Sequence, residues 1–442
     1  MPHPMELPPC NGWPGNRVTR SIFNLRWWVV SLLFVSTIIN YVDRQTFSIL
    51  AHEIQQSLHI TDVGYAGVVQ LFLASYTLAY LLTGRVTDRL GSKLGMTVFI
   101  VWWSIADVLT AFAGSMYSLG MYRFLLGVGE PGNWTVQAKA ISEWFPPYER
   151  GLAYGICTAG ATAGATVAVP LVAFLGVGLG WRAAFVITGS LGLLWVIPWM
   201  WLFRFSRDSH PVTDQAHDIT AGHTGARAAY PEGETEGQRW KLMLADPNTW
   251  RFTLARLLTD PVWYFFLFWF PKYLIGEHSL SLIRVGELAW VVYLAAGAGT
   301  ILGGWASGLL IKRGIPIVAA RRRILLIAAC IVPLSPLIAY APAVILVLGV
   351  ASFVVLAQLA WQVTLGTLII DVYPQRFVAT VFGIIATGGG LGGLLSTNAI
   401  GHLVTHFSYK PVYILMAFLH PCALFLLWKV RASSSPNGTE AK

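Results

Sequence analysis

Charged residues are scarce in this chain of 442 residues: Asp, Glu, Lys and Arg together make up 12% of it, against about 25% in soluble domains. Hydrophobic residues make up 55%. So little charge over so much apolar surface excludes an ordinary soluble domain and indicates an integral membrane protein. The net charge is +9. Because the basic residues gather in particular loops and not in one patch, we predict no nucleic-acid partner.

Cysteine is also rare, and the motifs of catalysis are missing. The four cysteines are scattered, without CxxC or other metal-ligand spacing, and we interpret them as structural thiols. The apolar segments contain no HExxH, no GxSxG at a strand–helix turn and no cluster of His or Cys. We therefore expect a protein that is not an enzyme and that uses no cofactor or metal. Residues 1–20 are polar and Pro-rich, so no cleavable signal peptide is predicted.

About twelve apolar segments are long enough to cross a lipid bilayer as helices. The predicted fold class is therefore an all-α integral membrane protein with twelve transmembrane helices. The segments lie near residues 27–50, 63–84, 94–113, 117–143, 151–175, 181–203, 251–275, 288–311, 322–341, 343–370, 378–405 and 410–430.

The longest polar stretch separates the first six segments from the last six. It lacks an apolar period and is interpreted as a cytoplasmic linker, and its end, residues 238–245, is predicted to form a short interfacial helix. Six spans, a linker and six more spans suggest two structural repeats. The predicted domains are a cytoplasmic N-terminal tail (1–26), a six-helix bundle (27–203), the linker (204–250), a second six-helix bundle (251–430) and a C-terminal tail (431–442).

The basic residues of the loops predict the orientation. Most of them lie in the two tails and in the loops after the even-numbered segments, whereas the opposite loops carry only Lys272, Arg284 and Lys410. Cytoplasmic loops are enriched in Lys and Arg. We therefore expect both termini in the cytoplasm. The basic residues of that side are Arg17, Arg20, Arg85, Arg89, Lys93, Arg150, Arg204, Arg207, Lys312, Arg313, Arg321, Arg322, Arg323, Arg376, Lys429 and Arg431.

A polar stripe interrupts the fourth apolar segment, in the sequence RFLLGVGEPGNWTVQ. Arg123 and Glu130 are seven residues apart, so on a helix both point the same way. A charge at the bilayer centre costs roughly 2.5–3.5 kcal/mol on insertion scales, so we expect both to face a polar interior. Pro131 removes a backbone donor and can bend the helix. We interpret the stripe as one wall of a central binding site.

A second charged pair lies inside the first apolar segment, in the sequence NYVDRQ. Asp43 and Arg44 are about 100° apart on a helix, and such a pair is expensive within a span unless it flanks a polar cavity. The alternative is a structural ion pair that locks the first segment to another helix.

The loop after the second segment follows the pattern GxxxDRxGxK, formed by Gly84, Asp88, Arg89, Gly91 and Lys93. The glycines allow a tight turn. Asp88 can meet a helix N-terminus or an arginine of a neighbouring loop and hold the two halves closed on that side. The pattern matches the signature loop of the major facilitator superfamily; the alternative is a merely basic anchor loop.

Further stretches carry a more particular resemblance. Residues 40–44 (NYVDR), RFLLGVGEPGNW and AKAISEWFPPYERGLAYGI resemble the anion:cation symporter family within that superfamily. Residues 258–274 (LTDPVWYFFLFWFPKYL) are similar to the seventh helix of bacterial hexuronate transporters, which carry galacturonate and glucuronate. The resemblance covers nearly the whole chain except the tails and the linker. It implies the major facilitator fold, two pseudo-symmetric six-helix bundles that rock about one central site, in a monomer of the bacterial inner membrane.

The resemblance also implies a function, the symport of a small organic anion, first of all a hexuronate, with protons. The family's two proton-binding acids correspond to Asp43 and Glu130. Its carboxylate-binding arginine corresponds to Arg123, and the arginine of its first segment to Arg44. The chemistry agrees, because a guanidinium grips a carboxylate bidentately and a buried carboxylate can take up a proton.

Other positions of the implied site concern the sugar. The resemblance places Tyr41 and Tyr76 near the substrate. Gly390 stands where several sugar-acid members have a substrate-binding Asn, and Thr158 where many have Asn, so the exact sugar acid stays open. For each residue of the second half that could grip a sugar ring, core packing is an equally good interpretation. These residues are Trp263, Tyr264, Gln358, Trp361, Gln362 and Thr387, with Asp260 as a further polar group or a helix cap.

Three other functions stay open at this point. The substrate can instead be an aldonate such as galactonate, or another small carboxylate. An organic-anion exchanger would be favoured by more than two inward arginines, and the sequence convincingly places only Arg44 and Arg123. A receptor with this architecture would give Asp43 and Glu130 no energetic task.

Overall fold

The computed structural model describes residues 18–204 and 235–430, and within these residues it is all-helical, without a strand. The predicted tails and linker, with Arg17, Arg207 and Arg431, lie largely or wholly outside the described residues. The helices are α1 (Val18–Ile49), α2 (Ala51–Leu58), α3 (Asp62–Thr110), α4 (Met116–Gly129), α5 (Gly132–Trp144), α6 (Pro147–Leu179), α7 (Trp181–Arg204), α10 (Glu236–Ala245), α11 (Pro247–Phe268), α12 (Phe270–His278), α13 (Leu282–Lys312), α14 (Ile317–Ile331), the 3₁₀ turn η1 (Val332–Leu334), α15 (Pro336–Tyr340), α16 (Val344–Val372), α17 (Val378–His406) and α18 (Lys410–Trp428).

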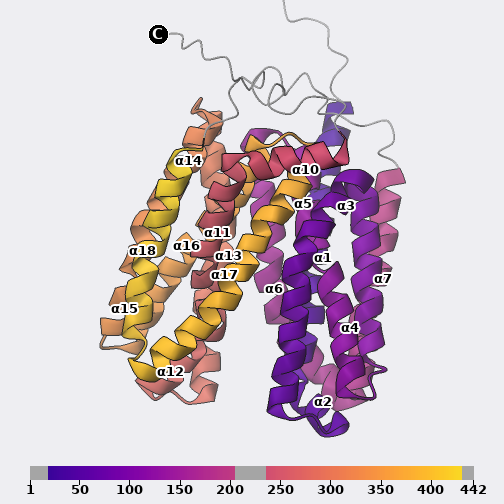
Figure 1. Ribbon diagram of the computed structural model, residues 1–442, viewed down its shortest axis with the longest axis vertical. Coiled ribbons are helices and arrows are strands. Elements are labelled where there is room, and N and C mark those ends of the chain that lie inside the picture. The colour runs from indigo at the N-terminus through magenta and orange to yellow at the C-terminus, as the bar shows by residue number, and fades with distance from the viewer. Residues whose placement is uncertain (1–17, 205–234, 431–442) are drawn as a thin grey trace, which may run out of the picture.

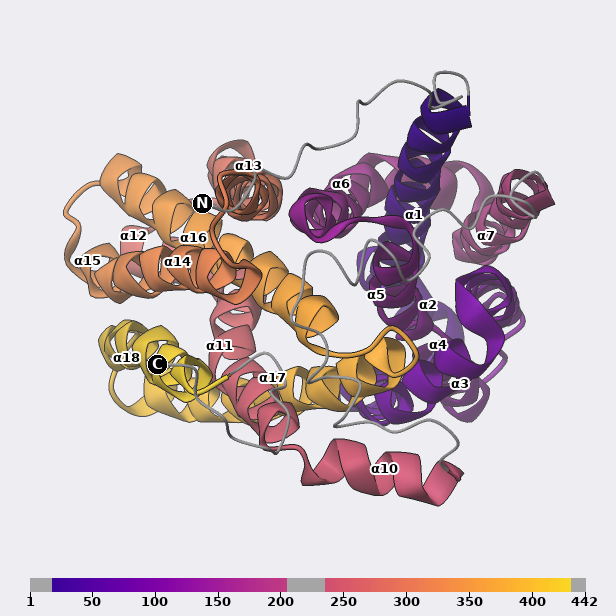
Figure 2. The ribbon, with the colours of Figure 1, turned by 90° about the horizontal axis from the view of Figure 1, so that it is seen from above.

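The long helices form two bundles that lie side by side, as predicted (Figures 1 and 2). Helices α1 to α7 make the N-terminal bundle, and α11 to α18 make the C-terminal bundle. The two meet along two seams, one between α3 and α17 and one between α6 and α13. The helix predicted at residues 238–245 is present as α10, which runs crosswise to the long helices (Figure 1).

In the described part of the chain, nine helices are long and apolar enough to cross a membrane. One of them, α3, is 49 residues long and combines two predicted segments across a kink at Gly91, whose φ of 72° suits glycine. Two further predicted segments are each broken in two, as α4–α5 and α11–α12. The predicted count of twelve crossings depends on how these helices are divided and stays a prediction.

The break between α4 and α5 falls within the predicted polar stripe. Glu130 follows the last residue of α4 and Pro131 precedes the first residue of α5. Proline has no backbone N–H, so the helical ladder is interrupted there. The break leaves the buried Glu130 side chain at a turn of the backbone and not in a continuous helix.

Glycines let the two bundles approach closely. A Cβ atom on Gly84 of α3 would lie 2.3 Å from the carbonyl oxygen of Ala379 in α17, and a Cβ on Gly304 of α13 would lie 2.0 Å from that of Gly151 in α6. No side chain fits at such distances. Both seams are therefore in backbone contact at the end of the molecule that carries Asp88, called the Asp88 end below.

Candidate substrate and proton site

Arg44 of α1 is the centre of the polar groups in the N-terminal bundle. Its Nε and Nη2 donate hydrogen bonds of 3.0 and 2.5 Å to Oε2 of Glu130. The guanidinium also lies 4.6 Å from the ring centroid of Tyr76, 5.2 Å from that of Tyr41 and 5.5 Å from that of Phe72. Cation–π contacts of this kind hold a guanidinium among aromatic rings. The Arg44 side chain is nevertheless 26% exposed, whereas Glu130 is fully buried.

Arg123, the other predicted arginine, lies deeper and has a different partner. Its Nη1 is 3.5 Å from Oδ1 of Asp107 in α3, and Thr188 of α7 donates a hydrogen bond of 3.1 Å to Oδ2 of the same carboxylate. The guanidinium stacks over Phe47 at 4.6 Å. Arg123 is only 2% exposed. In this conformation it ties α3 and α4 together, and its predicted grip on the substrate stays a prediction.

Asp43 is the buried acid without a hydrogen-bond partner. It is fully buried, and neither of its oxygens makes a hydrogen bond of normal geometry to a described residue, although the Trp103 side chain lies near it. Arg123, Asp107 and Glu130 are its electrostatic neighbours. A buried carboxylate that lacks such bonds is costly in the charged form. This setting favours a carboxyl group that carries a proton, and the predicted coupling role of Asp43 stays a prediction.

Tyrosine hydroxyls connect this group to the C-terminal bundle. Trp134 donates a hydrogen bond of 3.0 Å to the hydroxyl of Tyr76, which is 3.1 Å from the hydroxyl of Tyr80 one turn along α3. Tyr80 lies within electrostatic range of Arg256 in α11. Tyr76 was predicted; Tyr80 was missed, although its spacing of four residues from Tyr76 places it on the same face.

Arg256 is the inward arginine that sequence reasoning missed. Its Nε and Nη2 lie 3.0 and 2.9 Å from Oδ2 of Asp260, one turn along α11, and Gln362 of α16 donates a weaker hydrogen bond of 3.4 Å to Oδ1. Asp260 is thus a pairing group and not a helix cap. The spacing of four residues between Arg256 and Asp260 was the available signal.

The remaining candidates of the second half divide into two groups. Gln358 and Trp361 are fully buried and donate to the backbone oxygen and the hydroxyl of Thr259, so in this conformation they fill the core of the C-terminal bundle. Tyr264 lies within electrostatic range of Arg44 and Asp260 and therefore lies near both charged pairs.

The other three candidates also differ in setting. Trp263 is half-buried and packs on the apolar core, whereas Gln362 belongs to the Arg256 group. Thr387 donates a hydrogen bond of 3.4 Å to the backbone of Thr77 and so joins α17 to α3. Thr158, which stands in place of an Asn, bonds only to its own helix, at the carbonyl of Tyr154.

Asp88 caps the N-terminus of α17, as predicted. It accepts hydrogen bonds from the backbone nitrogens of Ala379 (3.3 Å) and Thr380 (2.7 Å) and from the Thr380 hydroxyl (2.6 Å). A helix N-terminus attracts a negative charge. Lys139 of α5 lies 3.2 Å from the same carboxylate and donates to the carbonyl of Gln375. Asp88 therefore connects the two bundles.

The other members of the predicted loop have different places. Gly84 is in the seam, and Gly91 forms the kink of α3. Arg89 is exposed, and Lys93 offers its backbone carbonyl to the indole of Trp199.

The second seam is closed by a buried ion cluster. Asp371 of α16 pairs with Arg150 of α6 at 2.9 Å and with Arg321 of α14 at 3.1 Å. Arg321 also donates to the backbone carbonyl of Pro147 at 2.8 Å, which brings the C-terminal bundle onto α6. The molecule is thus closed at the Asp88 end, and the ribbons diverge toward α2 and α12 (Figure 1).

A sequence model described as the Major Facilitator Superfamily matches residues 33–397. This chain belongs to the major facilitator superfamily. It is therefore a membrane-spanning transporter and not an enzyme, and the resemblance seen in the sequence is confirmed.

The curated relatives of this transporter include carriers of sugar acids. It is 28% identical over 416 residues to the hexuronate transporter of Escherichia coli K12, which covers 93% of this chain and 95% of the relative. It is 30% identical over 291 residues to the galacturonate transporter of Dickeya chrysanthemi, a match that covers 66% of this chain and 84% of the relative. It is 27% identical over 422 residues to the D-galactonate transporter of Escherichia coli O6:H1, covering 93% and 94%.

Solved structures of the superfamily agree with the fold of this transporter. The proton:xylose symporter XylE matches with a TM-score of 0.72 at 16% identity, over 93% of this chain and 96% of that one. The transporter FucP in the outward conformation matches with a TM-score of 0.68 at 14% identity, over 91% of this chain and 99% of that one. At such low identity the likeness concerns the fold alone.

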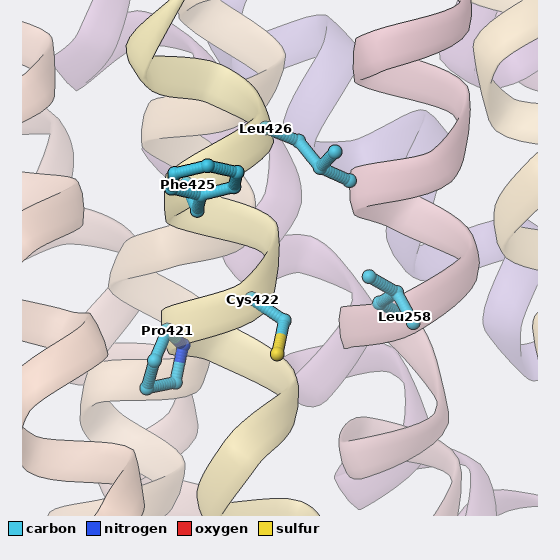
Figure 3. A pocket seen from close by; sticks show the side chains of 5 residues that line it. All are labelled: Leu258, Pro421, Cys422, Phe425 and Leu426. Carbon is cyan, nitrogen blue, oxygen red and sulfur yellow. The ribbon is translucent and has the colours of Figure 1, made fainter.

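A pocket on the transporter's outer surface lies away from the charged groups. It is formed between α11 and α18 by Leu258, Pro421, Cys422, Phe425 and Leu426 (Figure 3). None of these side chains carries a group that could bind a carboxylate. The pocket is therefore no candidate for the anion site.

Proposed function

We propose that this transporter imports a small sugar-acid anion together with protons across the bacterial inner membrane, with both termini in the cytoplasm. A hexuronate is the first candidate substrate. The observation that carries the proposal is the Arg44–Glu130 pair, in which a buried carboxylate holds a partly exposed guanidinium among aromatic rings. The curated relatives that carry hexuronate, galacturonate and galactonate support the substrate class.

The pair links proton binding to anion binding. While Glu130 is charged, it occupies two donors of Arg44. A proton on Glu130 removes that charge, and the guanidinium can then grip the substrate carboxylate bidentately. The aromatic rings of Tyr41 and Tyr76 around Arg44 provide faces for the sugar. Release of the proton on the other side lets Glu130 take Arg44 back and expel the substrate.

Asp43 provides a second proton site. If both acids load with one monoanion, each cycle moves a net charge of +1 inward. Such a cycle would harness roughly 2.3 kcal/mol per 100 mV of membrane potential, besides the pH gradient. A reversal-potential measurement that finds an electroneutral cycle would refute this stoichiometry.

Alternating access then requires the Asp88 end to open. The bonds of Asp88 to α17 and of Asp371 to Arg150 hold that end closed. In the proposed orientation this end is cytoplasmic, so the substrate enters from the opposite side. Rocking of the bundles breaks both contacts and exposes the site to the cytoplasm.

The test is uptake of labelled galacturonate into proteoliposomes with an inward proton gradient. We expect Arg44→Ala and Arg123→Ala to abolish uptake. We expect Glu130→Gln, which is neutral at every pH, to lose gradient-driven accumulation and the dependence of transport on pH, but to retain exchange of labelled for unlabelled substrate. Glu287→Gln is the control, because Glu287 pairs with Arg284 at an exposed position.

Each outcome separates a different part of the proposal. A wild type that ignores hexuronates but accumulates galactonate leaves the mechanism intact and changes the substrate to an aldonate. Uptake that needs an internal anion and no proton gradient identifies an exchanger. If Arg123→Ala transports as well as the wild type, Arg123 is structural and Arg44 alone grips the carboxylate. A Glu130→Gln variant with normal accumulation contradicts the proposed coupling.

A further inference from the structure

The two bundles present charged pairs of different construction. Glu130 holds Arg44 from another helix, and its second oxygen, Oε1, has no hydrogen-bond partner among the described residues. Asp260 holds Arg256 from the next turn of the same helix, and Gln362 occupies its second oxygen. Both oxygens of the Asp260 carboxylate are therefore occupied, whereas only one oxygen of Glu130 is.

The Arg256–Asp260 pair nevertheless faces the other bundle. The Arg256 side chain is 18% exposed, and its Nη1 makes no hydrogen bond to a described residue, whereas Nε and Nη2 are bound to Asp260. Tyr80 of α3 and Tyr154 of α6, both in the N-terminal bundle, lie within electrostatic range of it. Since Tyr80 also bonds to Tyr76, which stacks on Arg44, the two charged pairs lie at opposite ends of one row of tyrosines.

A glycine of α17 makes room for the pair. A Cβ atom on Gly389 would lie 2.0 Å from Oδ2 of Asp260 and 3.4 Å from Nε of Arg256. Any larger residue at position 389 would push the carboxylate out of place. Gly389 of α17 therefore serves the charged pair directly.

Building on the proposed function, we infer that the Arg256–Asp260 pair binds the uncharged, hydroxyl-bearing end of the substrate and selects singly charged sugar acids over sugar diacids. Arg256 donates to a hydroxyl oxygen and Asp260 accepts from a hydroxyl, so the pair suits a diol. A second carboxylate at that end would meet the negative charge of Asp260 and a guanidinium already neutralised. Repulsion of the wrong ligand gives specificity as effectively as attraction of the right one.

The test compares two inhibitors that differ at one end only: galactonate ends in a CH₂OH group and galactarate in a second carboxylate. Each competes with labelled galacturonate for uptake into proteoliposomes. We expect wild type to require at least tenfold more galactarate than galactonate for half-inhibition. Asp260→Asn preserves the shape and removes the negative charge, so Arg256 is freed to bind an anion. In that variant we expect the ratio to shift at least tenfold toward galactarate, whereas Glu287→Gln leaves it unchanged.

The same ratio can be measured without transport. Ligand-dependent thermal stabilisation of the purified protein reports binding of galactonate and of galactarate, even if Asp260→Asn no longer completes the cycle. A wild type that prefers galactarate, or an Asp260→Asn variant that weakens both ligands equally, overturns the inference while leaving sugar-acid transport in place. Failure of the wild type to bind or transport any sugar acid overturns the proposed function and this inference with it.

Discussion

Asp88 offers the sharpest test of how the two bundles are held together. Asp88→Asn keeps the size of the side chain and removes the charge that faces the N-terminus of α17 and the Lys139 ammonium. Removing one partner of a buried ion pair costs about 3–5 kcal/mol. The amide oxygen of Asn can still accept a hydrogen bond, so we take the lower value. A loss of about 3 kcal/mol corresponds to a roughly 150-fold increase in the population open at the Asp88 end.

Hydrogen exchange read by mass spectrometry is the assay, because it reports the population of open states. We expect faster exchange of the backbone amides of residues 378–386, which include the two that bond to Asp88. We also expect faster exchange in residues 147–156 of α6, which lie at the other seam and have no hydrogen bond to Asp88. Glu287→Gln, at an exposed pair of α13, is the matched control and leaves both segments unchanged.

The pattern of exchange decides the interpretation. Faster exchange at both seams means that the bundles separate as units. Faster exchange in residues 378–386 alone means that Asp88 caps α17 locally and does not lock the bundles. If Asp88→Asn folds and its hydrogen exchange is unchanged at both seams, the Asp88 charge does not hold the bundles together.

Two further predictions follow from the packing. Gly84→Leu places a side chain where a Cβ would already lie 2.3 Å from the carbonyl oxygen of Ala379, so we expect uptake to be lost because the Asp88 end cannot close. The control is Gly114→Ala, which has open space around its Cβ and should transport normally. Normal uptake by Gly84→Leu would contradict the close contact of α3 with α17. Arg123→Leu leaves the buried Asp107 carboxylate unpaired and should cost about 3–5 kcal/mol, seen as a lower thermal midpoint. Asp107→Asn in the same chain should restore most of that stability without restoring uptake, and a restored uptake would make Arg123 purely structural.

The sequence was sufficient for the features that depend on local pattern. The loop pattern around Asp88 predicted its contact with a helix N-terminus, and Pro131 predicted the break beside Glu130. The α10 helix was predicted from residues 238–245. For the break and for α10 the physical cause lies within a few residues of the chain, so a single sequence contains it. The Asp88 contact joins residues 292 positions apart and was expected because the loop pattern matches a known signature.

Contacts between distant segments were harder to predict. Arg44 and Glu130 were each predicted to face a cavity. Their ion pair was not predicted, because no local sequence pattern indicates a contact between residues 86 positions apart. Arg123 and Glu130 lie on one helical face and within electrostatic range of each other, as expected, yet each has its ion-pair partner on another helix. Arg123 pairs with Asp107 and Glu130 pairs with Arg44. Arg256 was overlooked because its partner Asp260 precedes a proline, which suggested a cap.

The ion pairs of the central site have a consequence for the empty carrier. Arg44 and Glu130 belong to one bundle, and Arg256 and Asp260 belong to one helix of the other. When the bundles rock without cargo, neither pair has to be pulled apart, so these four groups stay neutralised while the empty carrier resets. Of the two proposed proton sites, only Asp43 then returns as a charge outside an ion pair. Such a construction disfavours the slippage that would otherwise dissipate the proton gradient.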